Sequence, residues 1–506
     1  MSTKTYDATD GVLASTAANW VGGIAPIAGD NIVFDAANSG AHNCTFDLAL
    51  VFGSFTMSAG YTGVITQAAS FTVTSFSIGA GTFTGSDAYW LTCTAGWART
   101  AGTFTGSVAK VYVKGGTWAT NLYTFFFALR FSGSVTVDCP GQNIATYDGS
   151  DGSLIVDTGA VVSITATSML KVQGNNVANF SNLGTITGEG LLRITDYRNA
   201  AFTIPSLGTV NCPVSIDSQG GGAGTLAYTL GTGLILGSTL TTYGVTAGQN
   251  CQLTTGNYAV SATDITVGLR GILVGGSSII TCAGTFDSSA GTFTQGTSTV
   301  IMGANGNLKC TADGVYNLRV AEGITTTLTA ALNVYKDLRN NGTLTRGANT
   351  VSLLGAGEQT VSGYPDTAIT VNSVGPVIFH ECAHHHADVT ATAGTFVWTG
   401  YGRYITHGNL SISAISRKPN PFTDVQNLNG TLTFDAEARM KDLITDAGQT
   451  TVQSAGVQLG ISGKIATAGT FTQNTPTKVE RGERAFGFPF AVCLRPVNQV
   501  KGWGDA

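Results

Sequence analysis

The residues best suited to chemistry lie in one short stretch, HECAHHHAD at 380–388. Alternate side chains of an extended strand share a face, so His380, Cys382, His384 and His386 point the same way. Imidazoles two residues apart on a strand are separated by about 6.6 Å and can converge on one metal ion such as zinc. The stretch predicts that any bound metal sits at His384 and His386, helped by His380 or Cys382. The alternative is that the stretch is a solvent-facing polar loop without a metal. Apart from this possible metal, we expect no cofactor.

Carboxylates suggest a second chemistry, glycan hydrolysis, which needs two carboxyl groups about 5–10 Å apart beside a groove. The thirty acidic residues are scattered along the chain. Asp435 and Glu437 form the closest pair on one strand face, and Asp148 and Asp151 stand in a Gly–Ser loop that suits a turn or a weak cation site. The order of a Ser–His–Asp triad, a P-loop and a dinucleotide fingerprint are all missing from the sequence. We therefore expect no catalytic residues and a chain that is not an enzyme.

A repeated pentapeptide indicates which elements must hold these residues. AGTFT occurs at 80–84, 101–105, 290–294 and 468–472. Ala-Gly supplies a turn, and Thr-Phe-Thr alternates as a strand with one aromatic side chain pointing inward. Each copy therefore predicts a corner followed by a short strand.

Other short sequence repeats are spaced by about 20 residues. Val137-Asp138 and Val156-Asp157 are 19 residues apart, and Asn317-Leu318-Arg319 and Asp337-Leu338-Arg339 are 20 apart. In the alternating run at 316–320, Tyr316 is expected on the same face as Leu318 and Val320. Short strands and glycine turns at this period predict an all-β, elongated parallel β-solenoid with coils of about 20 residues, capped at both ends.

Three architectural alternatives accompany this prediction. A set of β-sandwiches would show strands every 8–12 residues rather than one repeated pentapeptide. The segment 435–444 is either a helix with Asp435 as its N-cap or a strand. Several aromatic side chains either stack on sugars or fill the core: Trp90, Trp97, Trp118, Trp398, Tyr89, Tyr401 and Tyr404.

The predicted organisation has three parts. Residues 1–70 form an N-terminal cap or attachment region, and residues 71–473 form the solenoid body. Residues 474–506 carry eight charged residues and four aromatic ones, which suits a C-terminal cap or a docking tail.

Composition excludes several classes of function. Charged residues make up only 11% of the chain, against roughly 25% in typical soluble proteins, so hydroxyl and amide groups must cover the surface. The net charge of −5 gives no electrostatic reason for nucleic-acid binding. No secretory signal or membrane-spanning run is expected, which predicts synthesis in a cytoplasm and no membrane insertion. The nine separated cysteines predict buried, reduced thiols, with interchain disulfides as the alternative.

The opening of the chain resembles a known class of proteins. Residues 19–35 contain W-V-G-G-I-A-P-I-A-G-D-N-I-V-F, which is similar to the W-x-G-G-x-x-P-x-x-G-D-x-x-x-F opening of β-solenoid structural proteins of bacteriophage virions and of some bacterial adhesins. Residues 290–323 also resemble phage solenoid segments. The resemblance implies that Trp20 plugs the end of the core, that Pro26 and Gly29 shape a loop, and that Ile32 and Phe34 point inward.

The resemblance implies a structural protein of a phage virion, an elongated solenoid that decorates the capsid or forms a tail fibre or spike. Its role would be adsorption or particle stabilisation, with synthesis in the host cytoplasm. The implied partners are copies of itself, most simply as a trimer, other capsid or tail proteins, and host surface glycans. In trimeric phage fibres, His-x-His pairs from three chains hold iron. The resemblance therefore adds iron to zinc as a candidate metal for His384 and His386. The alternatives are a glycan-cleaving tailspike and a bacterial surface adhesin.

Overall fold

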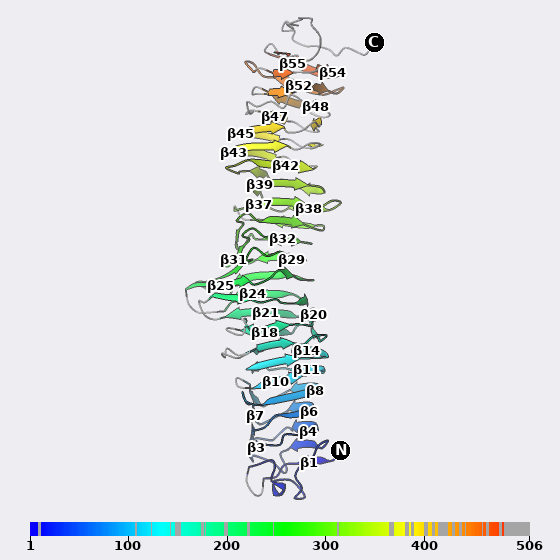
Figure 1. Ribbon diagram of the computed structural model, residues 1–506, viewed down its shortest axis with the longest axis vertical. Helices are drawn as coiled ribbons and strands as arrows, with labels where there is room; N and C mark the ends of the chain where they lie inside the picture. Colours follow the sequence, from blue (N-terminus) through cyan, green and yellow to red (C-terminus); the bar gives the residue numbers. More distant parts are fainter. Residues whose placement is uncertain are drawn as a thin grey trace. The chain divides into compact units, whose positions relative to one another are not determined.

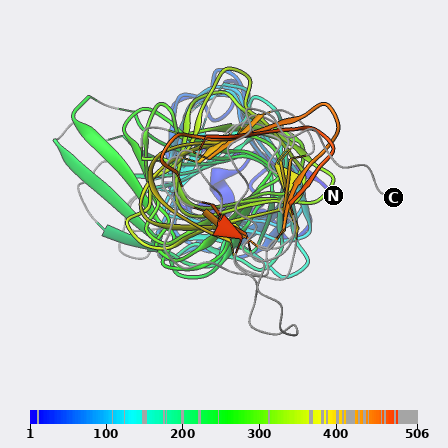
Figure 2. The same ribbon diagram turned by 90° about the horizontal axis from the view of Figure 1, so that it is seen from above.

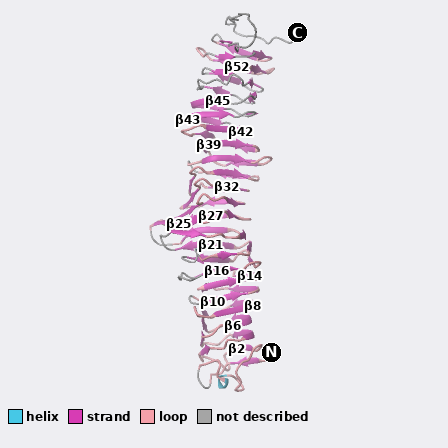
Figure 3. Cartoon of the chain, in the orientation of Figure 1, coloured by secondary structure: helices cyan, strands magenta, loops and turns pink. Residues whose placement is uncertain are grey.

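The structure is a computed structural model, and it confirms the all-β prediction: short strands dominate, and one 3-10 helix, η1 (Ala17–Asn19), lies near the N-terminus (Figure 3). Within the described residues, no helix has the length and apolar character of a membrane-spanning segment. The described residues are 1–8, 12–106, 109–122, 124–141, 143–146, 153–173, 177, 179–196, 201–219, 223–245, 247–310, 313–363, 369–379, 384–385, 389–398, 403–406, 410–412, 424–427, 431–434, 438–440, 442–457, 459–461, 465–474 and 478–479.

The chain forms two compact units: unit 1, Met1–Leu273, and unit 2, which begins at Val274. In each unit the strands pair in parallel with the coil before and the coil after, at a spacing of roughly 21 residues. Figure 1 shows the coils of unit 1 in blue to green and those of unit 2 in green to red. Each unit is therefore a β-solenoid, as the period predicted.

Unit 1 presents its longest face as one sheet with a short branch. Its strands, in spatial order, are β1 (Thr3–Thr5), β2 (Asn31–Phe34), β4 (Val51–Met57), β6 (Phe71–Ile78), β8 (Trp90–Arg99), β11 (Gly116–Thr120), β14 (Ser134–Asp138), β17 (Val161–Ile164), β20 (Thr185–Gly188) and β23 (Thr209–Asn211), with the branch β10 (Lys110–Val113), β13 (Ala128–Phe131), β16 (Ser153–Val156) and β19 (Ser181–Asn182).

The other faces of unit 1 are shorter ladders. One comprises β3 (Cys44–Phe46), β5 (Val64–Gln67), β7 (Thr82–Thr84) and β9 (Thr103–Thr105). Another runs through β12 (Thr124–Phe126), β15 (Asn143–Thr146), β18 (Met169–Gln173), β21 (Leu191–Asp196), β24 (Val214–Ser218), β27 (Leu240–Gly244) and β30 (Ile265–Val267). The remaining strands are β22 (Ala201–Ile204), β25 (Gly224–Leu230), β28 (Gln249–Thr254), β31 (Gly271–Val274), β26 (Leu234–Ile235) and β29 (Val260–Ala262). Figure 2 shows broad green strands of this part at the left of the view.

Unit 2 repeats the arrangement. Its main ladder is β32 (Ile279–Cys282), β35 (Thr299–Met302), β37 (Val315–Val320), β39 (Leu332–Asn340), β41 (Val351–Leu353), β43 (Ile369–Phe379), β45 (Val389–Trp398), β47 (Leu410–Ile412), β49 (Thr431–Phe434), β52 (Thr450–Gln453) and β55 (Thr470–Gln473), with β42 (Gln359–Gly363) as a branch. The other strands are β33 (Phe286–Asp287), β34 (Thr292–Thr294), β36 (Gly306–Lys309), β38 (Thr325–Leu328), β40 (Thr343–Thr345), β44 (His384–His385), β46 (Arg403–Thr406), β48 (Asp424–Asn427), β50 (Ala438–Met440), β51 (Leu443–Thr445), β53 (Leu459–Ile461), β54 (Ile465–Thr467) and β56 (Lys478–Val479).

The pentapeptide marks equivalent corners of successive coils. The first two copies become β7 and β9, which pair so that Phe83 stands beside Phe104. Their rings stack in parallel, with centroids 5.7 Å apart and an interplanar angle of 2°. The glycines before them, Gly81 and Gly102, have φ values of 70° and 66°, which other residues rarely adopt. The sequence repeats because each coil makes the same turn and contributes one ring to the core.

Large aromatic side chains form the core of the first coils. Trp97 stacks on Trp118 with centroids 4.9 Å apart and on Phe76 at 4.7 Å, and all three are buried. Aromatic pairs of this kind contribute about 0.5–1.5 kcal/mol beyond the area they bury. Trp97 and Trp118 therefore belong to the core and are not available to stack on sugars.

The N-terminal end of unit 1 is closed as the resemblance implied. Trp20 is 1% exposed and meets the rings of Tyr6 and Phe34 at 5.3 and 6.1 Å. Its Nε1 donates a hydrogen bond to the carbonyl of Ala14 at 2.7 Å. Gly29 turns the chain with a φ of 88°. Trp20 thus packs against the aromatic rings at the N-terminal end of the core.

The strand pairing tests three predictions made from the sequence. Leu318 and Leu338 are register partners, as their 20-residue echo predicted. The register suggested by the Val-Asp repeat was wrong. Val137 pairs with Ile164, because the coil is longer there, and not with Val156. The described part of segment 435–444 contains strand and no helix, namely β50 and the start of β51.

Candidate functional site

An open hollow of about 400 Å³ lies in unit 2 across four successive coils. Its lining combines two aromatic rings, an amide, an ammonium group and a glycine-rich loop: Gln295, Tyr316, Tyr335, Lys336, Gly355, Ala356 and Gly357. We call this set the tyrosine groove.

The tyrosine groove arises where the main sheet of unit 2 divides. In the pairing of β37 with β39, Tyr316 alone stands opposite two residues, Tyr335 and Lys336, which makes a β-bulge. In the next coil the strand is interrupted, so that β41 and β42 pair with the two ends of β39 and residues 354–358 loop out between them. Each coil thus carries more chain at this point than the coil before it.

One prediction was wrong at this point. Alternation placed Tyr316 on one face with Leu318 and Val320, but the buried residue here is Val315, and Tyr316 is only half-buried. Two residues rather than one separate the buried Val315 from the buried Leu318, so the alternation of β37 breaks here. The extra residue of β39 has a signal in the sequence, because the Tyr316 to Tyr335 spacing is one residue shorter than the Leu318 to Leu338 spacing.

A buried glutamine fixes the looped segment in place. Gln359 is fully buried, and its Oε1 accepts a hydrogen bond from the backbone N–H of Gly355 at 2.9 Å. Its Nε2 donates to the carbonyl of Val334 on β39 at 3.0 Å. A Cβ at position 355 would lie 2.1 Å from the carbonyl oxygen of Tyr335, so only glycine fits there. The floor of the groove is therefore built into the fold.

The two tyrosines have unused binding capacity. Among the described residues, neither ring packs against another aromatic ring, and neither hydroxyl has a hydrogen-bond partner. The Oε1 of Gln295 is likewise enclosed without a partner. The groove offers ring faces, hydroxyls and an amide, which suit recognition of a ligand.

A second surface cluster lies on β8, β10 and β13 of unit 1. The Arg130 guanidinium and the Lys114 ammonium lie 4.7 and 5.0 Å from the centre of the Tyr112 ring. Asp157 joins them, because it accepts hydrogen bonds from Arg130 Nε at 2.9 Å and from the Tyr112 hydroxyl at 2.9 Å. Trp90 meets Tyr112 edge to face at 6.4 Å. This cluster is held together by its own cation–π contacts and ion pair.

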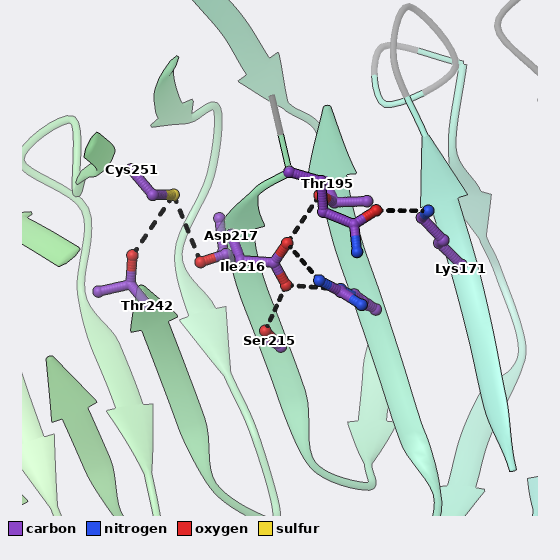
Figure 4. A network of polar contacts seen from close by, with 9 residues as sticks. Lys171, Thr195, Ser215, Ile216, Asp217, Thr242 and Cys251 are labelled. Atoms are coloured by element: carbon purple, nitrogen blue, oxygen red, sulfur yellow. Dashed lines mark hydrogen bonds and ion pairs between the residues drawn. The ribbon is translucent and has the colours of Figure 1, made fainter. Parts of the chain in front are cut away.

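A buried polar network occupies the ladder of β18, β21 and β24, and sequence reasoning did not find it (Figure 4). The carboxylate of Asp217 is fully buried and accepts four hydrogen bonds. Arg193 donates two of these, from Nε at 2.7 Å and Nη2 at 2.9 Å, and Thr195 and Ser215 donate the others at 2.7 and 2.8 Å. A buried carboxylate is tolerated when its charge and its lone pairs are matched in this way.

Lys171 extends the same network by one coil. Its Nζ donates to Oε1 of Gln219 at 2.7 Å, and the residue is 1% exposed. Burial, with the nearby Arg193 guanidinium, lowers the pKa of Lys171 to about 8. Lys171, Arg193 and Asp217 recur at the coil period of 22 and 24 residues, which was the available sequence signal.

The predicted metal site falls mostly outside the described residues. His384 belongs to β44, where it pairs with Ile405, but His380, Cys382 and His386 lie outside the described part of the chain. Within the residues that the structure does describe, no three His, Cys, Asp or Glu side chains gather as metal ligands would. The metal at His384 and His386 stays a prediction.

Some of the other candidate residues lie outside the described residues, and the rest lie within them. Asp148, Asp151, Asp435, Glu437 and Tyr401 lie outside the described residues, as does position 388 of the histidine stretch. The backbones of Trp398 and Tyr404 lie in β45 and β46. Tyr89 is 38% exposed. Seven cysteines are buried, as predicted: Cys44, Cys93, Cys139, Cys212, Cys251, Cys282 and Cys310.

Comparisons of the chain with protein-family models, with curated proteins and with solved structures found no match.

Proposed function

We propose that the chain is a non-enzymatic structural protein of a bacteriophage particle, as a capsid decoration or as a tail fibre or spike. The observation that carries the proposal is the closed N-terminal end of the coil stack. The W-x-G-G-x-x-P opening, which resembles that of phage solenoid proteins, is the segment that places Trp20 over the first core ring. Rigid parallel coils suit a part that must project from, or brace, a particle.

The N-terminal region also carries a feature expected of an attachment surface. Ile24, Ile27 and Val51 are 59%, 66% and 61% exposed. The backbone N–H of Gly29 donates to the carbonyl of Val51 at 2.8 Å, which holds β4 beside the loop that bears Ile27. Contiguous exposed apolar side chains commonly mark an interaction site. They support docking of residues 1–70 onto another virion protein.

A row of hydroxyl groups supports self-association as a trimer. Thr45, Thr66, Thr84 and Thr105 are register partners on four successive coils, and none of them is buried. A flank without charged side chains loses little solvation free energy when a copy of the same surface covers it. Light scattering of the purified chain at micromolar concentration should give the mass of a trimer, and a monomer would count against this part of the proposal.

The described carboxylates support a structural role over glycan cleavage. Several of them accept hydrogen bonds that hold corners of the coils, and the pairs are Asp30 with Ser2, Asp35 with Asn38, Asp47 with Ser15, Asp287 with Ser289 and Asp446 with Gln426. The hydroxyl of Ser2 lowers the pKa of Asp30, so this carboxylate is a poor proton donor near neutral pH.

Proteomics of particles purified from the phage whose genome encodes this chain tests the proposal. The chain should be a stoichiometric component of the virion, and its absence from infectious particles would refute the role. Release of reducing ends from a host polysaccharide by the purified chain would favour the glycan-cleaving tailspike instead.

A further inference from the structure

We propose that the tyrosine groove binds a neutral oligosaccharide, with a pyranose ring lying against Tyr316 and Tyr335. This inference concerns a site in unit 2 and does not depend on the proposed virion role.

The rings provide the first argument. Tyr316 and Tyr335 sit on adjacent coils, each directly after one of the buried register partners Val315 and Val334, and both tyrosines are half-buried. A sugar ring has an apolar face of C–H groups, and a phenol ring presents a flat apolar face to match it. Aromatic side chains on rigid strands bind such a face at low entropic cost, because each has only two side-chain torsions to fix.

The polar groups provide the second argument. A sugar ring is rimmed with hydroxyl groups, and each can both donate and accept a hydrogen bond. The groove supplies complementary groups in the two tyrosine hydroxyls and the amide of Gln295. The terminal torsion of a glutamine is broad, so its amide can turn to meet a sugar hydroxyl. A proline-rich peptide also fits aromatic grooves, but its proline nitrogens carry no N–H and cannot serve the Gln295 oxygen.

The one charged group in the lining of the groove is engaged by the protein itself. The ammonium group of Lys336 donates a hydrogen bond to the backbone carbonyl of Glu358. Asp337 and Glu358 are chain neighbours of Lys336 and Gly357, and neither of them lines the groove. A neutral sugar needs no opposite charge from the groove.

The dimensions fit a short oligosaccharide. The lining residues come from four successive coils, which at a strand spacing of about 4.8 Å span about 14 Å. The volume of about 400 Å³ falls in the range of small-ligand sites. The groove therefore takes two or three sugar units along the stack.

An array of neutral and uronic-acid oligosaccharides, probed with the full chain, tests the inference, followed by calorimetric titration of the neutral sugar that binds best. Tyr316→Ala and Tyr335→Ala should each weaken binding by roughly 3- to 10-fold, from the value of an aromatic contact. Tyr335→Phe keeps the ring and should change affinity by less than about threefold. Gly357→Leu, which adds a side chain where a Cβ meets no atom within 4 Å, should obstruct the groove.

Tyr89→Ala is the matched control, because Tyr89 is an exposed tyrosine of unit 1, and it should bind like the original chain. Equal urea midpoints show that the variants are folded. The inference is overturned if no neutral sugar binds at about millimolar concentration, or if the groove variants leave sugar binding unchanged. Preferential binding of a uronic-acid oligomer or a proline-rich peptide through these tyrosines would also overturn it.

Discussion

Two Arg–Asp pairs in the described part of the chain differ in burial, and this difference gives a sharp prediction. Arg193 and Asp217 have side chains 9% and 0% exposed, whereas Arg130 and Asp157 are 42% and 20% exposed. We expect Asp217→Asn to destabilise unit 1 far more than Asp157→Asn, although the chemical change is identical.

The magnitude follows from what each substitution leaves behind. Asparagine at 217 turns one acceptor oxygen into an amide N–H₂ that faces an Arg193 N–H, and it removes the negative charge beside Arg193 and Lys171. Breaking a buried ion pair in this way costs about 3–5 kcal/mol. Arg130 remains hydrated after Asp157→Asn, so the expected cost there is about 1 kcal/mol or less. The difference in free energy corresponds to a roughly hundredfold difference in the equilibrium constant for local opening.

Hydrogen exchange measured by mass spectrometry provides the assay, because it reports local opening in a repetitive protein whose unfolding need not be two-state. Peptides from β21 and β24 should exchange much faster in Asp217→Asn, while peptides from β13 and β16 change little in Asp157→Asn. If the two variants accelerate exchange equally, the buried network is not as we describe it.

The same network sets a pH dependence. Folding lowers the pKa of Lys171 from 10.5 to about 8, so between these values the unfolded chain holds a proton that the folded chain has lost. The contribution of Lys171 to stability therefore rises as pH increases from 8 to 10.5. A Lys171→Met variant should lack this rise when its stability is compared with the original chain at each pH, and an unchanged pH profile would contradict the assignment.

Three further predictions concern the core and its turns. Trp97→Ala should cost about 3–5 kcal/mol in urea unfolding because it opens the aromatic stack, whereas Trp90→Ala, on the half-buried surface, should cost about 1 kcal/mol; equal losses would contradict the core assignment. Gly116→Ala should lower the melting temperature more than Gly141→Ala, since both glycines have positive φ, but a Cβ at 116 would lie 1.6 Å from a backbone oxygen and one at 141 meets nothing within 4 Å. Burial raises the pKa of Cys212 from 9.0 to about 11, so the folded state loses about 1.4 kcal/mol per pH unit over that interval, and Cys212→Val should flatten the alkaline loss of stability by that amount.

The sequence predicted the coils because their signal is local. Phe83 and Phe104 stand in identical pentapeptides, and identical corners of a solenoid require identical turns. The echo of Leu318 and Leu338 also gave the correct register. Coil length was harder to predict, since Val137 pairs 27 residues ahead with Ile164, where the coil is longer than the period of 20.

The candidate site was harder to predict because it depends on departures from the period. Alternation placed Tyr316 on the same face as Leu318 and Val320, and only the structure shows that Val315 is the buried residue there instead. The ion pair of Asp217 with Arg193 could not be predicted, because two charged residues separated by one coil are far apart in the sequence. Only the strand register shows that they lie on adjacent coils. Repetition encodes the scaffold, and the tyrosine groove lies where that repetition breaks.

The central claim is that coils stack in parallel register, and a pair of engineered disulfides tests it most directly. Thr66, Thr84 and Thr105 are outward register partners on three successive coils. Adjacent coils place Cα atoms about 4.8 Å apart, within the range a disulfide spans, and coils two apart place them beyond about 7 Å. Under mild oxidation, Thr66→Cys with Thr84→Cys should cross-link within the chain, whereas Thr66→Cys with Thr105→Cys should not. Cross-linking of the second pair, or failure of the first, would contradict the stacked register.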